Sequence, residues 1–540
     1  MATAILLSAF MISIVALLFF IVAMTKGWLD PGGRGAHVIF ARDEVGRVED
    51  PAASALARDA LQAQSGAPPA TDEAELAARA TADRSTSTVT FVFLSCAVVW
   101  LVAASLAGLT ASLKMHWPDW LGAYEWLTFG RIRTLHLNGV AYGWTPMAGL
   151  GVAIWLLPRL LKTPLVGGNF AILGAILWNA GLIAGLGAIA VGFSDGMEWL
   201  EMPWQVDLLL VAGGALIAIP LVLTIRARQV EHIYVSIWYM GAALFWFPVL
   251  YLVGNLPGVH FGVQQAATNW WFGHNVLGLF YTPVALGTIY YFLPKVLGTP
   301  VRSYALSMLG FWTLAFFYGQ VGAHHLIGGP VPSWLITLST VQSMMMIVPV
   351  LAFSVNMYLT MKGRMGALLH SPTLHFVAFA GLAYMASSVQ GSFEALRSVN
   401  TVTHFTHYTV GHAHFGMYAF IAMALFGGIY FIMPRVMGRE WPYPRLILAH
   451  FWLVAVGVSI YFVSLTIGGW LQGTAMLDAA RPFMDSVAVT LPYLRARSVG
   501  GLLMTLGHVA FAAHFVAMVL RLGPARDSAP VFHDLEARHA

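Results

Sequence analysis

The chain has 540 residues, of which 58% are hydrophobic and only 10% are charged. Soluble domains carry roughly 25% charged residues, so the composition indicates a membrane protein, and the net charge of +4 gives no sign of a nucleic-acid partner. The single cysteine, Cys96, excludes a disulfide framework, thiolate-bound clusters and haem attachment through paired cysteines.

Apolar runs long enough to cross a bilayer predict one isolated span at 4–24, a polar stretch at 25–88 and then twelve more helices. No alternating pattern favours strands, so we expect an all-α polytopic membrane protein. The twelve spans are expected at 89–113, 131–157, 169–192, 205–225, 233–254, 271–294, 303–323, 335–361, 372–395, 409–434, 446–470 and 498–521.

Charge in the short loops predicts the orientation. Positive pairs such as Arg226 and Arg228 recur on one side, whereas loops on the other side are rich in Trp, Gly and acids, as at 194–204. Because cytoplasmic loops carry the Lys and Arg excess, the first side faces the cytoplasm. The stretch 25–88 is then expected to be a cytoplasmic tail and linker with little core of its own.

Nineteen histidines are many for so apolar a chain. A buried imidazole needs a hydrogen-bond partner or a metal, so the number indicates cofactors. Any one of them is more simply explained as a hydrogen-bonded core residue, but six share one membrane depth near the outer ends of four spans. These six are His136, His274, His324, His325, His412 and His414.

His412 and His414 are two residues apart, which turns them by about 200° to opposite faces of a helix. They cannot easily bind one metal, but they can each give an axial imidazole to a different haem. His136 lies at the same depth and is a candidate for the second ligand of one haem. Arg131 and Arg133 are placed to pair with haem propionates, or to act as simple interfacial anchors.

His324 and His325 are adjacent, so on a regular helix they diverge by about 100°. They can meet one ion only where the helix ends or distorts, and the sequence LIGGPVPSW at 326–334 predicts such an end. Together with His274 they form a three-imidazole site that suits copper, zinc or iron.

Five motifs resemble the catalytic subunit I of the haem-copper cytochrome c oxidases, most closely the cbb3 type (C-type, CcoN/FixN). The resemblance covers 89–521 and implies a 12-helix bundle, to which this chain adds one N-terminal transmembrane helix. The motifs are FGRIRTLH at 129–136, EHIYVSIW at 231–238, NWWFGHN at 269–275, FFYGQVGAHHL at 316–326 and HFTHYTVGHAHFG at 404–416.

The resemblance also implies a role for each of the six histidines. The copper B ligands would be His274, His324 and His325, the axial ligand of high-spin haem b3 would be His412, and low-spin haem b would lie between His136 and His414.

Tyr318 lies six residues before His324, where the C-type family carries a redox-active tyrosine cross-linked to the histidine equivalent to His274. Nitric oxide reductases share the six histidines but lack this tyrosine. They also carry glutamates on the span where GHNVLGLF at 273–280 has none. The resemblance therefore favours dioxygen reduction, with nitric oxide reduction as the alternative.

Further residues match the family less strongly. Thr282, Tyr304 and Ser307 resemble its proton path, although each is equally well explained as a helix hydroxyl bonded to its own backbone. Glu201 matches one acid of an outer-loop calcium motif, but Trp199 stands where its neighbouring acid is expected.

Two departures point to a divergent branch. Gln390 stands where the family has a glutamate that interacts with the proximal haem ligand, and His407 stands where an aspartate is usual. A neutral amide cannot supply the same negative charge, so we expect a higher haem b3 potential.

The N-terminal part resembles CcoS, a small assembly protein of the same oxidases, through G-W-L-D-x-x-x-x-x-A-H-x-I-F-x-x-D-E at 27–44. The simpler alternative is an extra anchoring helix. The expected organisation is therefore a CcoS-like segment with one transmembrane helix at 1–50, a cytoplasmic linker at 51–88, the catalytic domain at 89–521 and a cytoplasmic tail at 522–540.

The resemblance implies a proton-translocating terminal oxidase of a bacterial inner membrane that reduces dioxygen to water, surrounded by lipid. Electrons would come from a soluble or membrane cytochrome c through a cytochrome c-bearing partner subunit, since the chain has no further electron-entry cofactor. A haem-binding sensor or assembly protein without turnover is the alternative of a different class.

Overall fold

The computed structural model describes residues 34–41, 44–66 and 73–523, with isolated positions at 18, 22, 25 and 26. Most of the predicted span at 4–24 and most of the predicted C-terminal tail therefore lie outside the described residues. Within the described part every regular element is helical, and strand pairing is limited to one isolated bridge between Met197 and Leu200.

The membrane bundle begins with α3 (Glu73–Lys114), and its first long span is built from α4 (Phe129–Asn138), η4 (Gly139–Trp144) and α5 (Thr145–Leu161). Next come α6 (Gly168–Ala190), α7 (Trp204–Arg226) and α8 (Val235–Asn255), then α9 (Val263–Val276), η5 (Leu277–Tyr281) and α10 (Thr282–Leu297). The second half contains α11 (Tyr304–Phe317), η6 (Tyr318–Leu326), α12 (Ser333–Met345), α13 (Ile347–Met361), α14 (Pro372–Glu394), α15 (Arg397–Thr403), α16 (His407–His414), η8 (Phe415–Ala422), α17 (Met423–Met437), α18 (Pro444–Leu477) and α19 (Phe483–Val519).

Eleven of the spans within the described residues are long and apolar enough to cross a membrane, and they match eleven of the twelve predicted after residue 88. The polytopic all-α prediction is confirmed. The remaining predicted span, 303–323, is α11 followed by the 3₁₀-helix η6, so its outer part is not regular α-helix.

Three spans form the centre of the bundle. The apolar windows of Phe129–Leu161, Val263–Leu297 and His407–Met437 are 94%, 89% and 83% buried, whereas those of the other spans are 33–44% buried. These central spans carry four of the six candidate ligands, namely His136, His274, His412 and His414.

Each central span contains a π-helical turn just after a candidate histidine. The turns η4, η5 and η8 follow His136, His274 and His414 respectively. A π-helical turn changes which face of the helix points at a given neighbour, and such turns are frequent at functional sites. The sequence pattern did not predict these turns, because a π-turn leaves the apolar composition unchanged.

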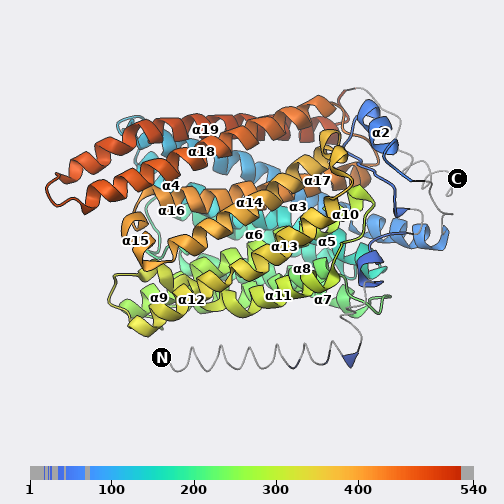
Figure 1. The fold of residues 1–540 in the computed structure, drawn as a ribbon, viewed down its shortest axis with the longest axis horizontal. Coiled ribbons are helices and arrows are strands. Elements are labelled where there is room, and N and C mark those ends of the chain that lie inside the picture. The colour runs from blue at the N-terminus through green and yellow to red at the C-terminus, as the bar shows by residue number, and fades with distance from the viewer. Residues whose placement is uncertain are drawn as a thin grey trace.

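The stretch that was expected to be a linker is folded instead, which corrects that expectation. Residues 34–66 include η1 (Arg34–His37) and α2 (Ala55–Gln62), and α2 lies at the opposite end of the bundle from α15 (Figure 1). Ile39, Phe40 and Leu61 are buried in the main core, and α3 already begins at Glu73. Because the stretch is short of apolar residues it cannot fold alone, but it packs on a surface that the bundle provides.

Candidate metal and haem centre

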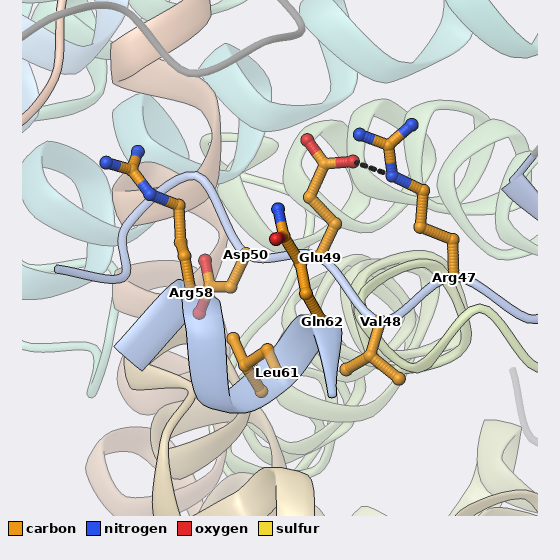
Figure 2. Close-up of a pocket in the computed structure, with 7 residues that line it drawn as sticks. All are labelled: Arg47, Val48, Glu49, Asp50, Arg58, Leu61 and Gln62. Atoms are coloured by element: carbon orange, nitrogen blue, oxygen red, sulfur yellow. Dashed lines mark ion pairs between the residues drawn. The ribbon is translucent and has the colours of Figure 1, made fainter. Parts of the chain in front are cut away.

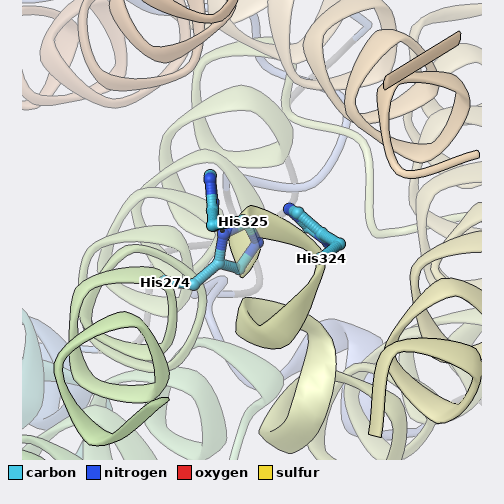
Figure 3. Close-up of side chains that lie close together, drawn as sticks. All are labelled: His274, His324 and His325. Atoms are coloured by element: carbon cyan, nitrogen blue, oxygen red, sulfur yellow. Dashed lines mark hydrogen bonds between the residues drawn. The ribbon is translucent and has the colours of Figure 1, made fainter. Parts of the chain in front are cut away.

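The structure brings His274, His324 and His325 together, with one nitrogen of each ring within 4.8 Å of the others (Figure 3). In the part of the chain that the structure describes, this is the one group of three or more side chains placed to hold a metal ion. His324 and His325 lie on the 3₁₀-helix η6, which ends at Leu326, and their ring centroids are 4.5 Å apart. The predicted departure from a regular α-helix is confirmed.

Neighbouring side chains fix the orientation of these rings. His324 Nδ1 lies 2.9 Å from the Ser343 hydroxyl, and His274 Nδ1 lies 2.9 Å from His325 Nε2. The Trp270 ring stacks on His325 at 4.0 Å between ring centroids. Two imidazole nitrogens this close suit a shared proton or cation between them, so the cluster fits a metal such as copper.

Tyr318 lies against this cluster. Its ring centroid is 5.4 Å from that of His274, and the two planes are inclined by 26°. A Cβ atom at Gly278 would overlap the tyrosine ring, so only glycine leaves room for it. Tyr318, the first residue of η6, is therefore held beside His274.

His136 and His414 face each other on two central spans. Their ring centroids are 6.2 Å apart and their planes are inclined by 9°. Both Nδ1 atoms lie 2.8 Å from a backbone carbonyl, that of Ala104 for His136 and that of Val410 for His414. Each Nδ1–H thus donates to the backbone, which leaves the lone pair of each Nε2 available to bind a metal.

The two ring centroids are 6.2 Å apart, which leaves room for one metal ion with a metal–nitrogen bond of about 2 Å on each side. The Tyr461 hydroxyl also lies 3.2 Å from His414 Nε2. The donor set therefore fits a haem iron with two axial imidazoles.

His412 points to a different neighbour from His414, as the spacing of two residues predicts. A Cβ at Gly391 of α14 would lie 2.6 Å from its Cε1 atom. His412 Nδ1 and Gln390 Oε1 are both buried without a hydrogen-bond partner among the described residues. Both atoms therefore remain available for a further polar partner.

Arg131 contacts the C-terminal end of α6, and Arg133 contacts the loop that follows it. Arg131 donates to the carbonyl of Ala190 at 3.2 Å, and Arg133 forms a 2.5 Å ion pair with Glu198. Sequence reasoning missed Arg497, which is 9% exposed and lies 5.0 Å from the Tyr461 ring. Its place inside an apolar helix was a signal, because a buried arginine needs an anionic partner.

The candidate proton-path residues are only partly brought together. Tyr304 and Ser307 lie one turn apart on α11. The Tyr304 hydroxyl is 2.8 Å from His232 Nε2, and Asn356 donates to the Ser307 hydroxyl at 3.0 Å. Thr282 lies at the start of α10, and no hydrogen bond within the described residues joins it to the other two.

Glu201, in the loop between α6 and α7, is buried and accepts a 2.9 Å hydrogen bond from Asn138. Burial raises the pKa of Glu201 to about 7, with a further rise from Glu198 that the Asn138 hydrogen bond opposes. Within the described residues no set of three acids forms around it. Trp199 turns its carbonyl to the Tyr142 hydroxyl, so the calcium site stays a prediction.

An all-helical membrane bundle with imidazoles gathered on its central spans defines the class of haem-copper oxidase subunits. Comparison with known proteins agrees. Residues 88–503 match the model of the family "Cytochrome C and Quinol oxidase polypeptide I". A solved haem-copper terminal oxidase dimer has a TM-score of 0.64 at 16% identity, with 86% of this chain and 90% of that chain covered, and so shares the fold.

Curated relatives point the same way. The chain is 30% identical to the cbb3-type cytochrome c oxidase subunit CcoN1 of Stutzerimonas stutzeri, over 77% of this chain and 91% of that protein. It is 33% identical to cytochrome c oxidase subunit 1 of Rhodobacter capsulatus, over 73% and 78% of the two chains. The chain belongs to the family of cytochrome c and quinol oxidase polypeptide I. It is therefore an oxidoreductase subunit that crosses the bacterial inner membrane many times.

Proposed function

We propose that this chain is the catalytic subunit of a cbb3-type oxidase that reduces dioxygen to water with electrons from cytochrome c, coupled to proton translocation. One observation carries the proposal: three imidazoles within 4.8 Å of one another, with the Tyr318 ring 5.4 Å from His274. A tyrosine beside a metal cluster suits the delivery of an extra proton and electron.

The ligand roles follow from the donor sets. Copper B is assigned to His274, His324 and His325, and low-spin haem b to the facing pair His136 and His414. High-spin haem b3 is assigned to His412, whose Nε2 faces Gly391 of α14, away from the pair His136 and His414. When bound, the haems supply one-electron transfer and the haem–copper pair supplies the chemistry of dioxygen reduction.

The chain's own residues orient the imidazole ligands and supply a proton. The carbonyls of Ala104 and Val410 fix two imidazoles in the tautomer that leaves Nε2 available. The Tyr318 Oη–H provides a proton next to the place where dioxygen binds. Four electrons must reach dioxygen together if peroxide is not to escape. The Tyr318 phenol can supply one of these electrons together with its proton.

Charge around His412 differs from that expected for the family. Gln390 is neutral, but one helical turn later the buried carboxyl of Glu394 accepts a hydrogen bond from Thr409. Thr409 is three residues before His412. We infer that Glu394 supplies part of the negative charge that Gln390 lacks, which reduces the expected rise in haem potential.

Further roles are assigned to residues around these centres. Arg131, Arg133 and the buried Arg497 are proposed to pair with haem propionates. Tyr304 and Ser307 are proposed as a proton path from the cytoplasm, with Thr282 further along it. A cytochrome c-bearing partner subunit is proposed to supply electrons, and Glu201 is proposed as a calcium ligand.

The decisive experiment measures haem, copper, oxygen consumption and nitric oxide consumption of the purified complex, for the wild type and for Tyr318→Phe. Two b haems and one copper, with oxygen turnover lost in the variant, would support the oxidase. Tyr358→Phe is the matched control, because Tyr358 is 54% exposed on α13.

The same measurement separates the alternatives. Rapid nitric oxide turnover that Tyr318→Phe leaves unchanged would assign nitric oxide reduction to this centre. A complex that binds haem but no copper would instead assign a sensor or assembly protein.

A further inference from the structure

Residues 34–41 and 44–66 form a compact layer on the cytoplasmic end of the bundle, and we call this layer the cytoplasmic cap. The family match begins only at residue 88, so the cap lies outside the part that the family shares. A small pocket separates its extended part at 47–50 from α2, and Figure 2 shows Asp50 and Leu61 within that lining. The contacts below the cap show what it covers.

Asp50 fastens the cap to α14. Its carboxylate is fully buried and accepts three hydrogen bonds from the first turn of that helix. They come from the Ser371 hydroxyl at 2.5 Å, the Thr373 backbone N–H at 2.9 Å and the Thr373 hydroxyl at 2.8 Å. A carboxylate at a helix N-terminus satisfies free N–H groups and the helix dipole, so this contact is specific.

Glu44 fastens the cap to α10 and α3. Its carboxylate lies 2.5 Å from Lys295 Nζ and 2.5 Å from an Arg79 nitrogen. Burial alone would raise the pKa of Glu44, but these cations and Arg159 outweigh it and hold that pKa well below its usual range. Glu44 therefore stays ionised and neutralises cations at the cytoplasmic helix ends.

The backbone of the cap also pairs with the loop after α10. Gly46 N–H donates to the Gly298 carbonyl at 2.7 Å, and Glu49 N–H donates to Val296 at 3.0 Å. Gly298 has φ of +60°, and a Cβ there would overlap the Arg47 carbonyl. The two chain segments are therefore in direct backbone contact, which is unlike a tethered tail.

The turn η1 of the cap rests on His232 and Tyr304. A Cβ atom at Gly35 would overlap His232 Nε2 and would lie 2.9 Å from Tyr304 Cε1. His232 Nε2 is 2.8 Å from the Tyr304 hydroxyl. Ile39 and Phe40 are 2% and 6% exposed beside this turn. The cap thus presses an imidazole onto the phenol at the cytoplasmic end of the proposed proton path.

We propose that the cytoplasmic cap is a working part of the mature enzyme that controls proton uptake by holding His232 against Tyr304. This inference rests on the proposed proton role of Tyr304. His232 takes a proton from cytoplasmic water and passes one to Tyr304, whose own hydroxyl proton moves inward, so the imidazole carries no net change over a turnover. An assembly role for the segment would not require this contact.

The test compares Gly35→Ala with Gly66→Ala in the full purified complex. A Cβ at Gly66, in the same cap, meets nothing within 4 Å. Proton uptake from the medium and electron transfer from haem b are followed during one turnover with dioxygen. We expect Gly35→Ala to slow proton uptake about fivefold, the factor for one lost hydrogen bond, with electron transfer and Gly66→Ala unchanged. Wild-type proton uptake in Gly35→Ala would overturn the inference.

Asp50→Asn gives an independent test with a readout that does not need turnover. Loss of its charge should speed hydrogen exchange at 34–41 and raise the modification of His232 by diethyl pyrocarbonate. Proton uptake should change in the same variant, and a loosened cap with unchanged uptake would overturn the inference. A wild-type complex that consumes no oxygen would refute the proposed function, while the exchange rates would still report whether the cap is docked.

Discussion

The histidine centre and the cytoplasmic cap are held in place by different physics. In the centre, rings rest on glycines of neighbouring helices, as Tyr318 rests on Gly278 and His136 on Gly108. In the cap, ion pairs and hydrogen bonds such as those of Glu44 and Asp50 join segments far apart in sequence. A ring packed against a glycine has only one position available. In a network of ion pairs and hydrogen bonds, one substitution removes one contact and leaves the others in place. Single changes should therefore act sharply in the centre and gradually in the cap.

His324→Ala, in the histidine centre, should have the largest effect on activity. It removes one of three ligands, and because changes to outer-shell partners alone cost 10–100-fold, oxygen consumption should fall by more than about 100-fold. Copper should be lost while both haems stay, which metal analysis and the reduced haem spectrum measure. His370→Ala on the cytoplasmic side is the control. Retained copper at the wild-type ratio would contradict the assignment.

Gly278→Ala tests whether space alone holds Tyr318. The new methyl group would overlap the tyrosine ring, whereas a Cβ at Gly319 meets nothing within 4 Å. Overpacking of this kind costs about 1–3 kcal/mol, and here it falls on the ring beside His274. We expect a large loss of oxygen turnover with haem content retained in Gly278→Ala, and wild-type turnover in Gly319→Ala. Equal effects of the two variants would show that general helix stability, not ring position, was changed.

The same reasoning applied to the facing imidazoles predicts a smaller effect. A Cβ at Gly108 would lie 2.5 Å from His136 Nδ1, the atom that donates to Ala104. Gly108→Ala should displace the ring and shift the absorption band or the midpoint potential of the low-spin haem, because the imidazole loses its fixed tautomer. The control is Gly187→Ala on α6, where a Cβ meets nothing within 4 Å. An unchanged haem spectrum would argue against His136 as a ligand.

The cap should respond gradually. Glu44→Gln keeps the shape but removes the charge that pairs with Lys295 and Arg79. We expect faster proteolysis and hydrogen exchange at 44–66 with the membrane bundle intact, because Asp50 still holds α14. Complete loss of the folded complex would contradict the idea that the contacts are individually replaceable.

Sequence reasoning succeeded where a periodicity or a motif carried the information. Apolar runs located the membrane helices, and the adjacent pair His324 and His325 predicted a distorted helix end, which η6 provides. It failed for the cap, because mixed charges at 34–66 look like a solvated tail until Lys295, Arg364 and Glu440 are placed next to them. The π-helical turns, and the glycines against which Tyr318 and His136 pack, depend on contacts between helices. A single sequence does not show which helices are neighbours.

The smallest expected effect concerns the outer loop above the histidine centre. Glu201 has a pKa of about 7 against 4.5 for a free glutamate, because burial disfavours its charge. Since the folded pKa is the higher one, the folded state holds a proton that the unfolded chain loses, and this stability fades as pH rises from about 4.5 to about 7. Glu201→Gln cannot ionise, so it should melt a few degrees above the wild type at pH 8 and close to it at pH 4.5. Thermal unfolding in detergent at both pH values measures this, and a wild type that gains relative stability at pH 8 would show an ionised Glu201, as bound calcium requires.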